Sequence, residues 1–238
     1  MRTLPHFPLH TVLFPHLPLP LHIFEERYRA MTRDVLADGS PFAGRFVVSM
    51  ITAGREVGGE ASAQAVGTIC EIRSAEEQPD GRWLLLVVGI ARARVGGVDS
   101  SGPYAVAEVE ELPEPTGNGA DRLLPLVQRA LDGYLATVKR FVARTASGGK
   151  HLPEQPDVTA TLDQVLKPIQ LPDEPVAASY AVAGVLQVEL SRKQHLLELT
   201  DAATRLRAEL ELLRREVRFL DDDAMPPVPP GDLGYHPN

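Results

Sequence analysis

The stretch Leu4–Met31, which reads LPHFPLHTVLFPHLPLPLHIFEERYRAM, decides how the rest of this chain is interpreted. Prolines and histidines interrupt its apolar residues throughout, so it lacks the compact apolar segment and the small-residue cleavage site of a signal peptide. No stretch of the chain approaches the roughly 18 uninterrupted apolar residues of a transmembrane helix. A single cysteine, Cys70, excludes a disulfide framework. We therefore expect a soluble, cytoplasmic protein.

Composition places the chain among ordinary globular proteins. Its 238 residues are 44% hydrophobic and 24% charged, which is enough for one or two folded domains. The formal net charge of −8 argues against a dedicated nucleic-acid-binding protein, which normally has a basic excess.

Short apolar runs bounded by Gly, Pro or Asp predict strands up to about residue 115. The predicted strands are Thr11–Phe14, Phe46–Ile51, Val66–Ile72, Trp83–Gly89, Ala91–Val95 and Tyr104–Leu112. The run Trp83–Val88 is apolar at every position, which is typical of a strand buried on both faces. One helix is expected early, because Phe24, Tyr28, Met31 and Val35 share a helical face and Asp38-Gly39 can end it. Six short strands with one inserted helix favour a small β-barrel.

Helical spacing dominates after a Pro- and Gly-containing seam at Glu111–Asp121. We expect a β-domain over 1–115, a helical bundle over 116–220 and a disordered acidic, Pro-rich tail over 221–238. The whole is then an α+β protein. The predicted helices are Leu123–Val142, Thr159–Leu166, Val176–Leu190 and a long one from Ser191 to about Leu220, opened by a Ser191/Gln194 capping box. Apolar residues recur every 3.5 positions from Leu199 to Leu220, which fits either a bundle seam or a homodimeric coiled coil and favours the bundle.

Motifs of the common catalytic and nucleotide-binding families are absent from the sequence. It contains no GxxxxGK[ST], GxGxxG, HExxH, GxSxG or CxxC, so we expect no enzyme activity and no cofactor. His6, His10, His16 and His22 invite a zinc interpretation, but their spacing on a proline-broken chain preorganises no tetrahedral site, and we predict none.

Three further residues and Cys70 have better structural than functional interpretations. Glu25 and Glu26 are neighbours on a helix and point about 100° apart, so they cannot share one substrate atom. We expect one of them at the helix N-terminus and Arg27 bound to a carboxylate or a strand-end carbonyl. Cys70 lies in the apolar stretch VGTICEI, where a thiol packs and does not react.

The Leu4–Met31 stretch resembles the opening of the N-terminal, substrate-binding domain of Lon proteases. The resemblance continues through Phe46–Met50, Gly54–Val57, Val66–Thr68, Asp80–Arg82, Gly89–Val95, Pro103-Tyr104, Ala107–Val109 and, more weakly, Ser191–Leu213. It implies a PUA-like β-barrel followed by a helical bundle that recognises substrate proteins. The ATPase and Ser-Lys peptidase modules of Lon have no counterpart before Asn238, so we expect a stand-alone Lon-domain protein.

The sequence features leave three classes of function to consider. The leading prediction is a non-catalytic module that binds unfolded or partly folded polypeptides, an adaptor in protein quality control that acts with a Lon-type protease, with the contact residues unassigned. RNA binding is the alternative, because PUA-like barrels bind RNA elsewhere, although the acidic charge opposes it. An enzyme with an unfamiliar site is the third class. A homodimer through the C-terminal helix is the oligomer that the heptad pattern would permit.

Overall fold

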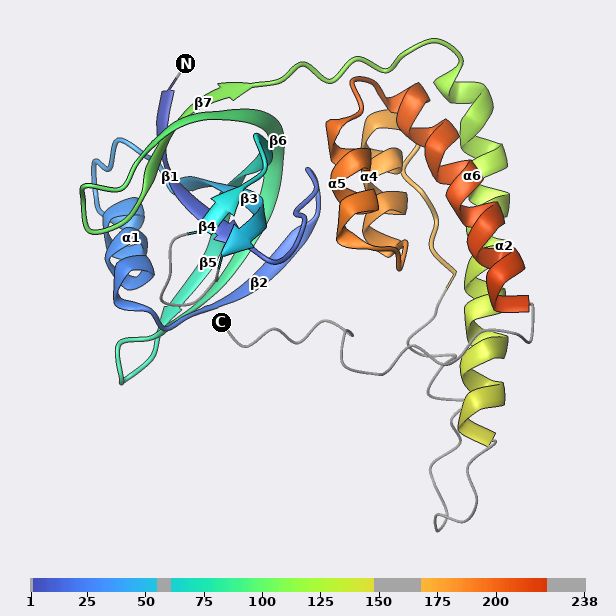
Figure 1. Ribbon diagram of the computed structural model, residues 1–238, viewed down its shortest axis with the longest axis horizontal. Helices are drawn as coiled ribbons and strands as arrows, with labels where there is room; N and C mark the ends of the chain where they lie inside the picture. Colours follow the sequence, from blue (N-terminus) through green and yellow to red (C-terminus); the bar gives the residue numbers. More distant parts are fainter. Residues whose placement is uncertain (1, 55–60, 148–167, 222–238) are drawn as a thin grey trace. The chain divides into compact units, whose positions relative to one another are not determined.

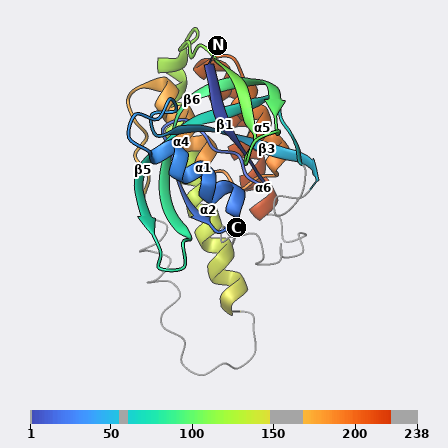
Figure 2. The same ribbon diagram turned by 90° about the vertical axis from the view of Figure 1, so that its left-hand side faces the viewer.

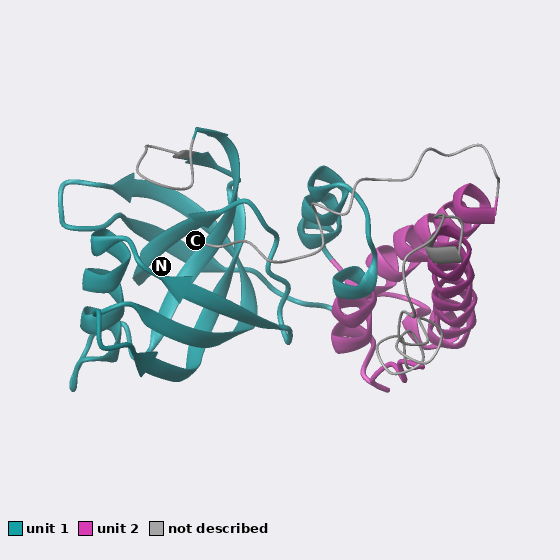
Figure 3. Cartoon of the chain, turned by 90° about the horizontal axis from the view of Figure 1, so that it is seen from below, with its two compact units in different colours: residues 1–115, 183–200, 234–238 teal, residues 116–182, 201–233 magenta. Residues whose placement is uncertain are grey.

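The structure is a computed structural model that describes residues 2–54, 61–147 and 168–221 (Figure 1). It divides into two compact units (Figure 3). Among the described residues, unit 1 contains those up to Pro115 together with Ala183–Thr200, and unit 2 contains Thr116–Val182 and the residues from Asp201 on. Helix and sheet are both present, as predicted. The domain limits at residues 115 and 220 stay predictions, and the division above also places Ala183–Thr200 in unit 1.

Unit 1 is built on a sheet whose strands are paired in the order β1-β7-β6-β5-β3-β4. The strands are β1 Arg2–Leu9, β2 Pro18–Ile23, β3 Arg45–Gly54, β4 Ala61–Ala63, β5 Val66–Glu77, β6 Trp83–Asp99 and β7 Val106–Glu111. Because β1 also pairs with β3 in parallel, the pairings return to the strand from which they started. The remaining strand, β2, pairs with β6. A PUA-like barrel stays the prediction for this arrangement.

The two N-terminal strands differ from the prediction. The segment 11–14 was expected to be a strand and is irregular, whereas the proline-containing segments on either side form β1 and β2. β1 tolerates Pro5 and Pro8 because its ladder to β7 covers Arg2–Pro5 and its ladder to β3 covers His6–Leu9, so each half has a side that requires no N–H donor. Because proline is depleted in strands, strand propensity did not predict β1 or β2.

The strand β6 corrects two further expectations. It runs unbroken from Trp83 to Asp99, where two strands were predicted. It is also not buried on both faces: Leu85 and Val87 lie in the core, whereas Leu84 and Leu86 are exposed. The apolar run Trp83–Val88 therefore forms one buried face and one exposed apolar face of the strand.

The core of unit 1 forms where the helix α1, Glu26–Leu36, packs on the strands (Figures 1 and 2). Tyr28, Met31 and Val35 are buried in one cluster with Phe7 and Phe46, as their spacing predicted, whereas Phe24, expected on the same face, lies before the helix and is half-buried. The rings of Phe7 and Tyr28 lie 4.2 Å apart between centroids. Burial of this helical face holds α1 on the sheet.

The described residues of unit 2 contain the helices α2 Ala120–Ser147 and α6 Ala202–Asp221 and most of α4 Pro175–Val185, whereas α5 Leu190–Glu198 belongs to unit 1. The helices α2 and α6 pack together, and Ala203, Leu206, Leu210 and Leu213 of the predicted heptad stripe are buried. That much of the stripe is an internal seam, and the homodimer stays a prediction. The predicted helix Thr159–Leu166 and the predicted tail beyond Asp221 lie outside the described residues.

The long C-terminal helix was predicted as one element and is two. α5 ends at Glu198, and α6 begins at Ala202, where the Asp201 carboxylate accepts bonds from the backbone N–H and the hydroxyl of Thr204, both at 2.8 Å. This cap starts a new helix. The 3.5-residue spacing of apolar residues continues through the break, so the spacing alone predicts one helix. The predicted Ser191/Gln194 capping box is absent: Glu189 occupies the N-cap position, and the Gln194 amide binds the Val66 carbonyl at 3.0 Å.

Candidate functional site

The outward face of β2 and β6 in unit 1 carries a row of uncovered apolar residues. In the antiparallel ladder, Pro18 is opposite Val88, Pro20 is opposite Leu86, and His22 is opposite Leu84. Residues directly opposite each other share a face of the sheet. Leu84 and Leu86 are 45% and 39% exposed, both prolines are exposed, and Val88 is half-buried. We call these five residues, Pro18, Pro20, Leu84, Leu86 and Val88, the apolar stripe.

Polar residues of β5 border the stripe. Glu76 is opposite Leu84, Ser74 is opposite Leu86, and Glu71 is opposite Val88. Arginines balance the negative charge of the Glu71 carboxylate, which pairs with Arg45 at 3.0 Å and with Arg73 at 2.6 Å. An apolar centre with a polar rim is the composition of a protein-binding surface.

The free edge of β2 is unsuited to the addition of another strand. Within the described chain, β2 pairs only with β6, and that ladder runs continuously from Pro18 to Ile23. A proline is compatible with such a ladder only if its nitrogen faces away from the partner strand, so Pro18 and Pro20 both present a nitrogen without hydrogen to the outer edge. The stripe can therefore bury a ligand's side chains, but the edge beside it offers few backbone donors.

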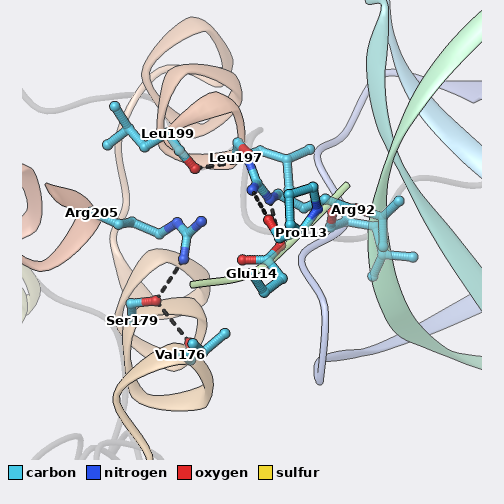
Figure 4. Close-up of polar contacts among 10 residues, drawn as sticks. Arg92, Pro113, Glu114, Val176, Ser179, Leu197, Leu199 and Arg205 are labelled. Atoms are coloured by element: carbon cyan, nitrogen blue, oxygen red, sulfur yellow. Dashed lines mark hydrogen bonds and ion pairs between the residues drawn. The ribbon is translucent and has the colours of Figure 1, made fainter. Parts of the chain in front are cut away.

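A second polar cluster in unit 1 is structural. Arg92 of β6 is only 2% exposed, and its guanidinium donates to the carbonyls of Leu197 (3.0 Å), Leu199 (2.8 Å) and Pro113 (2.9 Å) and to the Glu114 carboxylate (Figure 4). Buried charges are tolerated when they are paired in this way. Arg92 thus ties the end of α5 and the segment after β7 to the sheet.

The four histidines singled out from the sequence are not gathered into a metal site. His6 is buried and its Nε2 lies 2.9 Å from the Ser49 hydroxyl, whereas His10 and His16 are exposed and His22 is half-buried on β2. Burial lowers the pKa of His6 to about 4. In residues 2–54, 61–147 and 168–221, no group of three or more His, Cys, Asp or Glu side chains could hold a metal ion.

The remaining singled-out residues have structural places. Glu25 stands at the N-cap position of α1 without a side-chain cap bond, and its carboxylate lies 3.2 Å from Arg27. Glu26 pairs instead with Arg29 and Arg33. Cys70 is fully buried, and burial raises the pKa of its thiol well above the usual range, so the thiolate needed of a nucleophile is disfavoured.

None of the helices in the described residues combines the length and the apolar character that crossing a membrane requires.

Comparison with known proteins identifies the family. Residues 3–215 match the family model described as the ATP-dependent protease La (LON) substrate-binding domain. The chain belongs to this family. The match covers the substrate-binding domain and no protease or ATPase module, so it gives no support to catalysis.

Two relatives with the name Lon protease are much longer than this chain. The Lon protease of Trichlorobacter lovleyi is 27% identical over 226 residues, covering 93% of this chain and 25% of the relative. That of Escherichia coli K12 is 25% identical over 218 residues, covering 91% and 25%. The Lon substrate-binding domain described here thus spans about a quarter of the length of these relatives.

Solved structures agree on the fold. The Lon N-terminal domain protein from Xanthomonas campestris superimposes with a TM-score of 0.58 at 23% identity, covering 89% of this chain and 98% of that one. The N-terminal domain of the Mycobacterium avium complex Lon protease gives a TM-score of 0.60 at 19% identity, covering 90% and 98%.

Proposed function

We propose that this Lon substrate-binding domain binds unfolded or partly folded polypeptides on the apolar stripe of unit 1, without catalysing a reaction on them. The observation that carries the proposal is the exposure of Leu84 and Leu86, side by side with Pro18 and Pro20, on an otherwise ordinary sheet surface. Membership of a substrate-binding family supports it.

The expected affinity is modest. Full burial of a leucine contributes about 1.5–3 kcal/mol, so covering two leucines that are 45% and 39% exposed contributes roughly 1 kcal/mol each. Ordering an unfolded segment opposes binding. The two leucines thus supply about 2 kcal/mol of the roughly 8 kcal/mol that a micromolar dissociation constant requires, so we expect dissociation constants weaker than micromolar, which suits a module that captures many clients and releases them.

We further propose a biological role for this binding. A non-catalytic module of this kind serves as an adaptor that presents polypeptides to a Lon-type protease in the cytoplasm. Recruitment would be tested by adding the protein to a Lon-type protease and an unfolded client and measuring the rate of client degradation, which the adaptor is expected to increase.

Substitution of the stripe tests the binding itself. The ligand is fluorescein-labelled, reduced and carboxymethylated α-lactalbumin, which remains unfolded, and the measurement is fluorescence anisotropy. The double variant Leu84→Ser/Leu86→Ser is expected to bind about tenfold more weakly, since it removes most of the apolar area available to the ligand.

Val98→Ser provides the matched control, because Val98 is 49% exposed near the other end of the same strand and lies outside the stripe. It is expected to bind as the unsubstituted protein does. Equal losses in both variants, or no loss in the double variant, would show that the stripe is not the binding surface.

A further inference from the structure

The part of the β5–β6 hairpin that carries Leu84 and Leu86 extends beyond the closed set of strand pairings, and β2 is the strand that pairs with it there, from Ile23 opposite Trp83 to Pro20 opposite Leu86. β5 pairs with β3 only as far as Glu71, whereas its ladder with β6 continues to Glu77 opposite Trp83. An irregularity between Ile72 and Ser74 marks the point where β5 leaves β3. We call residues Arg73–Leu86 the hairpin arm.

The turn of the hairpin arm is internally ordered. The Gln78 N–H donates to the Arg82 carbonyl at 2.7 Å and the Gly81 N–H to the Gln78 carbonyl at 2.8 Å. Gly81 has a φ of 80°, the left-handed conformation that glycine supplies in tight turns, as the Pro79-Asp80-Gly81 sequence indicates. These bonds fix the shape of the turn, but they do not attach it to the rest of unit 1.

Arg29 of α1 supplies an attachment. Its Nε donates to the Gly81 carbonyl at 2.6 Å, and its Nη1 lies 3.0 Å from the Glu26 carboxylate, which steadies the guanidinium. A side chain at position 81 would collide with this guanidinium, so the two groups are in close contact. The helix that holds Arg29 is itself anchored, because the neighbouring residues Tyr28 and Met31 are buried in the core.

We propose that Arg29 is a positioning residue for polypeptide binding: it attaches the tip of the hairpin arm to α1 and, together with the β2 ladder along Trp83–Leu86, holds Leu84 and Leu86 in one orientation. This inference rests on the proposed function. A surface that is already ordered loses less conformational entropy when it binds, so loosening the arm weakens binding without removing any contact residue. Arg29 itself lies outside the apolar stripe.

Arg33 offers a matched control on the same helix. It has the same charge and pairs with the same Glu26 carboxylate at 2.8 Å, but it has no described contact with the hairpin arm. Arg29→Lys provides a second test, because it keeps a cation beside Glu26 while removing the guanidinium Nε that donates to Gly81.

The experiment measures hydrogen exchange in the hairpin arm and the affinity for unfolded, labelled α-lactalbumin in the full chain. Arg29→Ala and Arg29→Lys are expected to exchange faster at the amides of 78–86 and to bind about three- to tenfold more weakly. Circular dichroism is expected to show melting close to that of the unsubstituted protein, and Arg33→Ala to match that protein in all three measurements.

Two results would overturn the role of Arg29: binding that is unchanged in both Arg29 variants, or an equal loss in Arg33→Ala, which would reduce the effect to helix charge. If Arg29→Ala melts early, Arg29→Lys decides between positioning and stability. If the unsubstituted protein itself binds no unfolded polypeptide, the proposed function is wrong. The exchange data then show separately whether Arg29 attaches the arm.

Discussion

At the scale of single residues, two buried titratable groups make the stability of the two units depend on pH in opposite directions. His6 in unit 1 is kept neutral by burial, with its pKa lowered from 6.5 to about 4. Glu209 on α6 in unit 2 is fully buried, and burial raises the pKa of its carboxyl well above 4.5 although Arg205 opposes the shift. Each group binds protons differently in the folded and unfolded chain, which is the origin of the pH dependence.

His6 predicts a loss of stability in mild acid. Between pH 6.5 and 4 the unfolded chain takes up a proton at this position and the folded chain does not, so the free energy of unfolding falls as the pH falls. The full effect is on the order of 3 kcal/mol. Urea denaturation of His6→Gln between pH 7 and pH 4 is expected to show a shallower fall than the unsubstituted protein. Parallel curves would contradict the buried, neutral imidazole.

Glu209 predicts the opposite slope. In the described part of the chain, neither of its carboxylate oxygens has a hydrogen-bond partner. The folded chain retains the proton above pH 4.5 while the unfolded chain releases it, so this group lowers the free energy of unfolding as the pH rises. The stability of Glu209→Gln relative to the unsubstituted protein is therefore expected to increase from pH 4.5 to pH 7. A difference that does not change with pH would show that the carboxyl ionises normally.

The fully buried Arg205 explains part of this environment. Its guanidinium lies 4.0 Å from the centre of the Tyr180 ring and donates to the Ser179 hydroxyl at 2.9 Å, and Ser179 in turn donates to the Val176 carbonyl (Figure 4). These contacts direct the cation toward α4.

At the scale of elements, local patterns predicted the segments that are locally determined. α1 has its core face at Tyr28, Met31 and Val35, three of the four positions expected, whereas Phe24 precedes the helix and is half-buried. The misses occur where tertiary context decides. Pro18 and Pro20 are acceptable in β2 only because β2 has an open edge, and the break before α6 depends on a single cap at Asp201.

The same reasoning explains why the candidate site was not found from the sequence. The alternation in Pro18–Ile23 places Leu19, Leu21 and Ile23 on one face and prolines and His22 on the other, but prolines are weak strand signals. The run Trp83–Val88 was interpreted as buried on both sides. Only the strand register, which places Leu84 and Leu86 beside that proline face, reveals an uncovered apolar surface.

The prolines of β2 predict that binding does not depend on the backbone of the ligand. Strand addition at this edge would need N–H donors that Pro18 and Pro20 lack, so the ligand is held by its side chains. The L- and D-enantiomers of one apolar peptide are expected to have dissociation constants within about threefold of each other in an anisotropy titration. A D-peptide that binds more than about tenfold more weakly would indicate backbone pairing instead.

At the scale of the whole molecule, the proposed recognition surface is one face of unit 1. The chain belongs to the Lon substrate-binding family, and it shares its fold with solved Lon N-terminal domains. The stripe contains neither Lys nor Arg, so it does not suit the phosphates of RNA, whose binding needs cationic side chains. RNA is therefore expected not to displace a bound unfolded polypeptide when it is added as a competitor.

Photocrosslinking can locate the bound polypeptide on the surface of unit 1. A benzophenone amino acid is placed at position 84, within the stripe, or at position 98, exposed on the same strand but outside it, and each protein is irradiated with unfolded, labelled α-lactalbumin. Strong crosslinking is expected from position 84, suppressed by unlabelled polypeptide, and little is expected from position 98. Equal crosslinking from both positions, or crosslinking from position 84 that the competitor does not reduce, would contradict binding on the apolar stripe.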